Sequence, residues 1–281
     1  MRNFIQAQGM RVRQLISRAQ DVKTEFTKRQ KFIIASGLQS IVYLLSVTVF
    51  PDVFWPTFIV SIGAVAALTF WALLEELSDI KYVTLLVLPV FFFGAQVFFV
   101  RMIGPGALLV LLSLIFYIAG SYSLLLTQNI YNVAAIRTIQ LVRAANAVGF
   151  TFTLLCAFFI FSVIWGGRLH PLILAFLILS ISFPLILQAL WSVQLEEKLS
   201  INLISMSLLL AFLTGEIAFA FAFWPILPTI GALALVASIY VFLSLSQLHL
   251  SQKLSVRAIW EYLSVAILLL VVIMLTTKWG V

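Results

Sequence analysis

Glu216 is the residue of this sequence whose type and position most clearly call for a chemical role. It precedes Trp224 by eight residues inside a long apolar run, which is about 12 Å along a helix. An acid at the centre of a membrane span costs about 2.5–3.5 kcal/mol, so its side chain must face protein or water. We expect Glu216 either to share a hydrogen bond with Gln96 as a neutral acid or to bind a proton or cation on a transport path.

Two doubled carboxylates, Glu75-Glu76 and Glu196-Glu197, could in principle act as acid and base or bind a metal. Neither pair continues into the EExxxR pattern with downstream histidines that intramembrane metalloproteases of the CAAX-protease kind use. Each pair lies just after a tryptophan at the end of an apolar run, where a solvated carboxylate costs little. The chain also has no glycine-rich phosphate loop, no nucleophile elbow and no HExxH motif. The sequence therefore predicts no enzyme, no metal site and no cofactor.

The elements that hold these side chains are apolar runs. The chain is 63% hydrophobic and 10% charged, with a mean hydropathy of +1.15, whereas soluble chains carry about a quarter charged residues. Nine runs are long enough to span a bilayer, at 32–50, 54–74, 82–100, 107–127, 146–165, 171–192, 201–223, 227–248 and 259–277. The predicted fold is an all-α polytopic bundle of about nine transmembrane helices.

The positive charges give this bundle an orientation. If the N-terminus is inside, every one of the 17 lysines and arginines except Arg101, Arg168 and Lys278 falls on the inner side. Cytoplasmic loops of membrane proteins carry such an excess. We expect a multi-pass protein of the cytoplasmic membrane with its N-terminus inside and, after nine spans, its C-terminus outside.

Residues 1–31 form a separate basic segment. Apolar residues recur there at three- and four-residue spacing, which predicts an amphipathic helix. Its positive face includes Arg11, Arg13, Arg18, Lys23, Lys28 and Arg29. We expect this cytoplasmic helix to rest on anionic lipid head groups rather than to bind nucleic acid or a cytosolic partner. Residues 32–281 make up the transmembrane bundle.

The stretch 127–149 is the longest gap between apolar runs. On a helix its polar side chains gather in one sector, which contains Gln128, Asn129, Asn132, Gln140, Arg143 and Asn146. This pattern is typical of a helix that lies at the membrane surface or continues out of a span.

An internal repeat runs through the spans. The doubled glutamates are 121 residues apart, and the pairs Trp71 and Trp191, and Pro105 and Pro225, are each 120 apart. These matches at offsets of 120 and 121 predict a duplicated four-helix unit, with copies at 54–165 and 171–277. Because four spans is an even number, the copies would share one orientation and form a parallel repeat.

The stretch LLLTQNIYNVAAIRTIQLVRAANAVGF and the later LQALWSVQLEEK are similar to a family of uncharacterised bacterial polytopic membrane proteins. The resemblance implies a membrane bundle and brings no activity, substrate or cofactor with it.

Three functions remain open on this basis. A non-enzymatic structural or assembly component fits the short loops and the lack of motifs. A small-solute or ion transporter fits the repeat and the pair Glu216 and Gln96. A lipid-processing enzyme would need a groove to the inner leaflet lined by Glu75, Asp79 and Arg137, and is least favoured.

Overall fold

The structure is a computed structural model, and it describes residues 27–49, 53–74, 81–134, 140–196 and 199–277. All regular structure in these ranges is α-helical apart from single 3₁₀ residues at helix ends. The helices are α2 (Lys28–Thr48), α3 (Phe54–Leu73), α4 (Lys81–Ile103), α5 (Ala107–Ala134), α6 (Val142–Gly166), α7 (Pro171–Gln194), α8 (Ile201–Phe221), α9 (Pro228–Leu250) and α10 (Val256–Thr276). Each of these nine is long and apolar enough to cross a membrane. The predicted all-α multi-pass fold is confirmed.

Local sequence signals place the helix ends. α7 and α9 each begin with a proline, which suits the first turn because its missing N–H would have no partner there. The Ser200 hydroxyl accepts a hydrogen bond from the Leu203 N–H at 3.2 Å and caps α8. Between α4 and α5, Gly104 has a φ of +104°, which only glycine adopts without strain.

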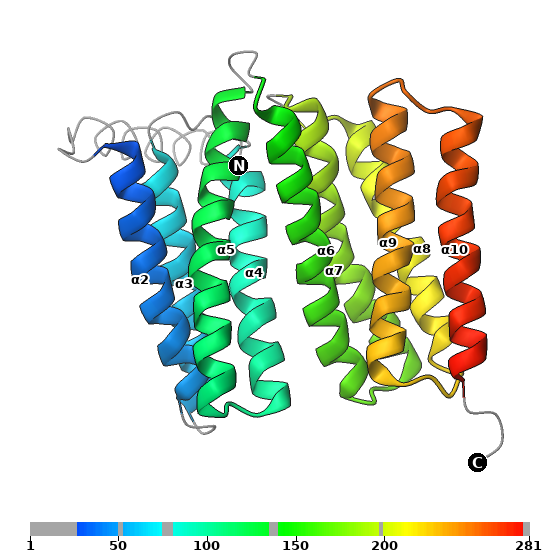
Figure 1. The fold of residues 1–281 in the computed structure, drawn as a ribbon, viewed down its shortest axis with the longest axis horizontal. Helices are drawn as coiled ribbons and strands as arrows, with labels where there is room; N and C mark the ends of the chain where they lie inside the picture. Colours follow the sequence, from blue (N-terminus) through cyan, green and yellow to red (C-terminus); the bar gives the residue numbers. More distant parts are fainter. Residues whose placement is uncertain (1–26, 50–52, 75–80, 135–139, 197–198, 278–281) are drawn as a thin grey trace, which may run out of the picture.

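Successive helices run in opposite directions across one slab (Figure 1). We call the side on which α2 begins the α2-start side. The chain reverses there between α5 and α6, between α7 and α8, and between α9 and α10, and α10 ends on the opposite side. The direction of each described helix matches the predicted alternation of nine spans.

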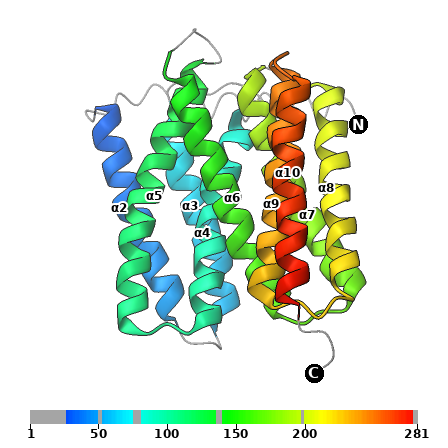
Figure 2. The same ribbon diagram turned by 45° about the vertical axis from the view of Figure 1, so that its right-hand side comes forward.

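The helices pack as two four-helix bundles. In the first, α2 packs on α3 and α5, and α4 completes the ring by packing on the same two helices. In the second, α6 packs on α7 and α9, and α8 also contacts both of these. The bundles meet where α6 packs on α4 and α5 and where α7 contacts α4. α10 packs on α9 at the outer side of the second bundle (Figure 2).

The centre of the first bundle is filled by aromatic rings. Tyr117 of α5 stacks on Tyr43 of α2, with ring centroids 4.5 Å apart, and on Phe92 of α4 at 5.5 Å. All three side chains are buried. A Cβ on Gly120 would lie 2.5 Å from the Phe92 ring, so this glycine lets α4 and α5 approach. The first bundle therefore has a densely packed core rather than an open channel at this level.

One hydrogen bond recurs in both bundles. The Asn132 amide of α5 donates to the carbonyl of Leu73 at the end of α3, at 3.3 Å. The Gln247 amide of α9 donates to the carbonyl of Ala189 near the end of α7, at 3.2 Å. Both bonds join the second and fourth helices of a bundle near the α2-start side. The copies predicted at 54–165 and 171–277 each begin one helix later than these bundles, although both have a period of four helices. The duplication stays a prediction.

The stretch 127–149 does not form one surface helix in the described residues. α5 continues to Ala134, and the chain enters α6 at Val142. Gln128 and Asn132 are buried, with exposed fractions of 0% and 1%. The first part of the stretch therefore continues α5, and no separate surface helix forms in the described residues. These amides are buried because they lie on the side of α5 that packs on neighbouring helices, and Asn132 bonds to the end of α3.

The predicted amphipathic helix at 1–31 lies almost wholly outside the described residues. Of its basic side chains, Arg11, Arg13, Arg18 and Lys23 are not described. Lys28 and Arg29 lie in the first turn of α2, and Arg29 is exposed.

Candidate functional site

Glu216 lies on the outside of the second bundle. It belongs to α8, which packs on α7 and α9 and stands at the edge of the protein (Figure 2). Its side chain is exposed. Five residues separate it from the end of α8 at Phe221, or about 7.5 Å along the helix axis. The carboxyl group therefore faces the surroundings of the bundle within the apolar zone.

A groove between α7 and α8 surrounds this carboxyl group. Its volume is about 420 Å³, and it is lined by Leu172, Ala175, Phe176, Leu179, Phe212, Gly215, Glu216 and Phe219. We call it the α7/α8 groove. Glu216 is the one ionisable side chain in this lining, and the rest is apolar apart from glycine. The groove thus presents a single carboxyl group within an apolar surface.

Close packing of the two helices fixes the floor of the groove. A Cβ on Gly215 would lie 3.2 Å from the carbonyl oxygen of Ala175 and 3.2 Å from the Cβ of Leu179. Small residues at such positions let membrane helices approach closely. α7 and α8 accordingly share the most extensive helix contact in the described part of the chain. Glu216 follows Gly215 directly, so its backbone is held by this contact while its side chain is exposed in the groove.

The structure does not join Glu216 to Gln96. Gln96 lies on α4, is 2% exposed, and neither of its amide atoms has a hydrogen-bond partner among the described residues. It precedes the end of α4 at Ile103 by seven residues, about 10 Å, so its depth is close to that of Glu216. The expected hydrogen bond between them is absent because one side chain faces the interior and the other faces outward.

The other candidate residues lie apart from this groove. Glu75, Asp79 and Arg137 fall outside the described residues. Glu196 is exposed after the end of α7, where its backbone carbonyl accepts a hydrogen bond from the Trp191 indole N–H at 3.0 Å. Among the described residues, no group of three or more His, Cys, Asp or Glu side chains comes together.

Sequence reasoning missed the role of Arg101. Its Nη1 atom donates to three carbonyls at the end of α2, those of Ser46, Val47 and Val49, at 3.4, 3.2 and 2.9 Å. Its Cζ atom also lies 4.3 Å from the centroid of the Phe54 ring. A cation at a helix C-terminus is stabilised by the helix dipole and by the free carbonyls there. No sequence spacing connects α4 with the end of α2, so only the fold could reveal this contact.

Comparison with known proteins places the chain in a family. No curated protein matches it, and no solved structure matches it. The sequence model of one family, described as "Protein of unknown function (DUF5656)", matches residues 53–276. That range includes α3 to α10 and with them Gln96, Glu216 and the α7/α8 groove. The chain therefore belongs to the DUF5656 family of proteins of unknown function.

Proposed function

We propose that this multi-pass membrane protein is a non-enzymatic structural or assembly component of a bacterial cytoplasmic membrane, and that it binds another membrane protein through the α7/α8 groove. The observation that carries the proposal is the outward position of Glu216. Its carboxyl group is exposed in an apolar groove, and no described residue is bonded to it. The bacterial setting rests on the similarity of 124–150 and 187–198 to bacterial membrane proteins.

The energetic argument concerns the surroundings of the carboxyl group. An acidic side chain facing hydrocarbon costs several kcal/mol at the centre of a span and less toward the interface. Glu216 lies about 7.5 Å inside the end of α8, so part of that cost applies. A donor from a partner helix would remove it by forming a hydrogen bond in a medium of low dielectric constant.

The proposed partner is a transmembrane helix of a different protein with a basic or amide side chain at the depth of Glu216. Exposed apolar side chains of the groove, including Leu172, Phe176 and Phe212, would supply the packing contacts. A second copy of this chain is a poorer occupant. A two-fold contact would bring the same surface of both copies together and place one Glu216 opposite the other.

The two bundles differ in how their third helix is covered, and this difference supports the proposed partner contact. In the first bundle α4 is covered by α6 and contacts α7, in addition to its own bundle partners. The corresponding helix of the second bundle, α8, packs on α7 and α9 and is otherwise open at the edge of the described structure. A partner helix on α8 would supply the cover that the second bundle gives to α4.

The alternative function, transport of a small solute or ion with Glu216 on the path, needs that carboxyl group inside the bundle. The Glu216 carboxyl group is instead exposed in an outer groove and does not contact Gln96, which favours assembly over transport. We further propose that the α2-start side faces the cytoplasm, because the basic residues gather there and cytoplasmic loops carry such an excess.

Photocrosslinking in native membranes tests the proposed contact. A photoreactive residue replaces Phe212 or Phe219, which line the groove, or Leu112, an exposed residue of α5. Leu112 lies five residues inside the start of α5, as Glu216 lies five residues inside the end of α8. We expect a discrete protein adduct from Phe212 or Phe219, its loss in Glu216→Leu, and no such adduct from Leu112.

Lipid adducts alone at all three positions would overturn the proposal, as would a protein adduct that Glu216→Leu leaves unchanged. Differently tagged copies of the chain in one cell identify a homo-oligomer. An adduct between the two tags would contradict the proposed partner and replace it with a second copy.

A further inference from the structure

A second groove lies on the opposite flank of the second bundle, near the α2-start side. It passes over α9, which lies between α6 and α10 in Figure 1. Its volume is about 430 Å³. We call it the α9 groove, and its main residues are Asn146, Phe150, Tyr240, Gln247, Lys253 and Tyr262. Unlike the α7/α8 groove, it is polar along much of its length.

The polar groups follow one face of α9. Tyr240, Ser244 and Gln247 recur at four- and three-residue spacing and all line the groove, as neighbours on one helix face do. Tyr240 precedes the end of α9 at Leu250 by ten residues and Gln247 by three, so the stripe extends from about 15 Å to about 4.5 Å from that end. A polar stripe over this interval crosses the level of lipid head groups and enters the apolar zone.

The charge in the groove is positive. Lys253 follows α9, is exposed, and has no ion-pair partner among the described residues. Arg143 precedes Asn146 by three residues on α6, so it lies on the same helix face one turn nearer the surface, and its side chain is exposed. The groove therefore combines one cation in its wall with another at its rim.

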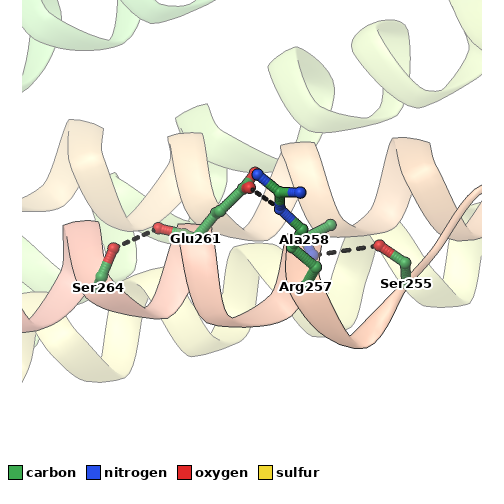
Figure 3. A network of polar contacts seen from close by, with 5 residues as sticks. All are labelled: Ser255, Arg257, Ala258, Glu261 and Ser264. Atoms are coloured by element: carbon green, nitrogen blue, oxygen red, sulfur yellow. Dashed lines mark hydrogen bonds and ion pairs between the residues drawn. The ribbon is translucent and has the colours of Figure 1, made fainter.

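Glu261, the one acidic residue of α10, is paired with Arg257. The Arg257 Nε atom lies 3.1 Å from Glu261 Oε1, one turn along α10 (Figure 3). The Ser255 hydroxyl accepts a hydrogen bond from the Ala258 N–H at 3.2 Å and caps the same helix. Glu261 forms its ion pair with Arg257 and none with Lys253, and the Arg257–Glu261 pair has no net charge, so the positive charge of Lys253 remains.

One polar atom beside the groove lacks a partner. The Oδ1 atom of Asn146 is buried and makes no hydrogen bond with any described residue. Gln247 uses its amide nitrogen for the Ala189 carbonyl. A buried amide oxygen that accepts no hydrogen bond is unfavourable, and a ligand hydroxyl group that donated to it would remove this cost.

Aromatic rings form the deeper wall. The Tyr240 ring lies 5.8 Å from the Phe150 ring and 5.6 Å from the Tyr262 ring, measured between centroids. These rings come from α9, α6 and α10, so they join the three helices that border the groove. They offer an apolar surface below the polar groups, against which an acyl chain can pack.

We propose that the α9 groove binds an anionic phospholipid, with the phosphate group at Lys253, the polar head-group atoms at Asn146 and the upper acyl chain along Phe150 and Tyr240. Basic pockets between transmembrane helices on the cytoplasmic side are suited to such head groups. The site uses other helices and other residues than Glu216, so it does not depend on the proposed partner contact.

Binding is tested with the purified full-length chain in neutral detergent. The thermal unfolding midpoint is measured with added phosphatidylglycerol, phosphatidylcholine or soluble glycerol phosphate, and bound lipid is counted by native mass spectrometry. We expect phosphatidylglycerol alone to raise the midpoint and to remain bound. Removing one positive charge should weaken its affinity about fivefold, since each basic residue near an anionic surface contributes about that factor.

Lys253→Gln is the test variant, and Arg168→Gln is its matched control, because Arg168 is an exposed cation that follows the far end of α6 and does not line the groove. Loss of phosphatidylglycerol binding in Lys253→Gln with retention in Arg168→Gln supports the site. Equal losses in both variants, no loss in either, or equal shifts with phosphatidylcholine would overturn it. An equal shift with glycerol phosphate would show a small-anion site and contradict the assignment to lipid.

Discussion

A Cβ atom on Gly149 of α6 would lie 2.5 Å from the hydroxyl oxygen of Tyr131 on α5. The same hydroxyl donates a hydrogen bond to the carbonyl of Ala145, one turn earlier on α6, at 2.8 Å. Tyr131 is fully buried. The hydrogen bond holds the ring against α6, so the missing side chain at position 149 makes room for a fixed group rather than for a flexible one.

Gly149→Ala should therefore destabilise the protein by about 1–3 kcal/mol, the usual range for overpacking. Its control is Gly63→Ala in α3, where a Cβ would meet no atom within 4 Å and the substitution should be neutral or stabilising. Thermal unfolding in detergent measures both. If Tyr131 is the cause, Tyr131→Phe should recover part of the loss in a double variant, whereas strictly additive effects would contradict that origin.

Arg101 gives a second prediction. Arg101→Gln removes a cation from the end of α2 and from the Phe54 ring. Because hydrogen bonds to charged groups contribute about 1.5–3 kcal/mol, we expect the free energy of unfolding to fall by an amount in that range. Arg168→Gln is the control, because Arg168 is exposed at the end of α6 on the same membrane side. Equal effects of the two substitutions would show that charge alone, and not the contact with α2, matters.

Two buried glutamines should respond in opposite ways to the same change. Gln39 of α2 donates to the Thr69 hydroxyl of α3 at 2.9 Å and to the Val65 carbonyl at 3.4 Å. Gln39→Leu should cost about 0.6–1.7 kcal/mol, the range for hydrogen bonds between membrane helices. Gln96→Leu should leave stability unchanged or raise it, because no described residue bonds to the Gln96 amide. A larger loss from Gln96→Leu than from Gln39→Leu in thermal unfolding would reverse this assignment.

Membrane orientation is checked with reporter fusions. A reporter that is active only in the cytoplasm should be active when fused before Arg2 and silent when fused after Val281, because α2 and α10 begin on one side and α10 ends on the other. Activity of the fusion after Val281 together with silence of the fusion before Arg2 would invert the proposed orientation.

The number, length and direction of the helices could be predicted from the sequence because hydrocarbon thickness and backbone hydrogen bonding leave few alternatives for long apolar runs. The direction in which each side chain points, toward the interior or outward, could not be predicted. Gln96 and Glu216 occupy comparable depths on α4 and α8, yet α4 is enclosed between the bundles and α8 stands at an edge. Gln128 and Asn132 resemble a solvated face in the sequence, but they are buried because they lie on the side of α5 that packs on neighbouring helices. In an apolar chain, burial depends on which helices meet, and hydropathy does not encode that.

The outward position of Glu216 predicts how the isolated protein responds to its removal. Because no described residue bonds to this side chain, Glu216→Leu should leave the thermal stability of the purified chain unchanged or slightly raised, and Glu216→Gln should behave in the same way. A clear loss of stability in Glu216→Leu alone would mean that the carboxyl group supports the bundle from within.

Native-gel migration in mild detergent extracts of the source membranes tests the assembly role most directly. The wild-type chain should migrate as a species larger than the purified chain, and Glu216→Leu should migrate as the purified chain does. Glu216→Gln, which keeps a donor and an acceptor, should retain part of the larger species. Wild-type protein that migrates as the isolated chain, or a larger species that persists unchanged in Glu216→Leu, would contradict the proposal that Glu216 joins this protein to a partner.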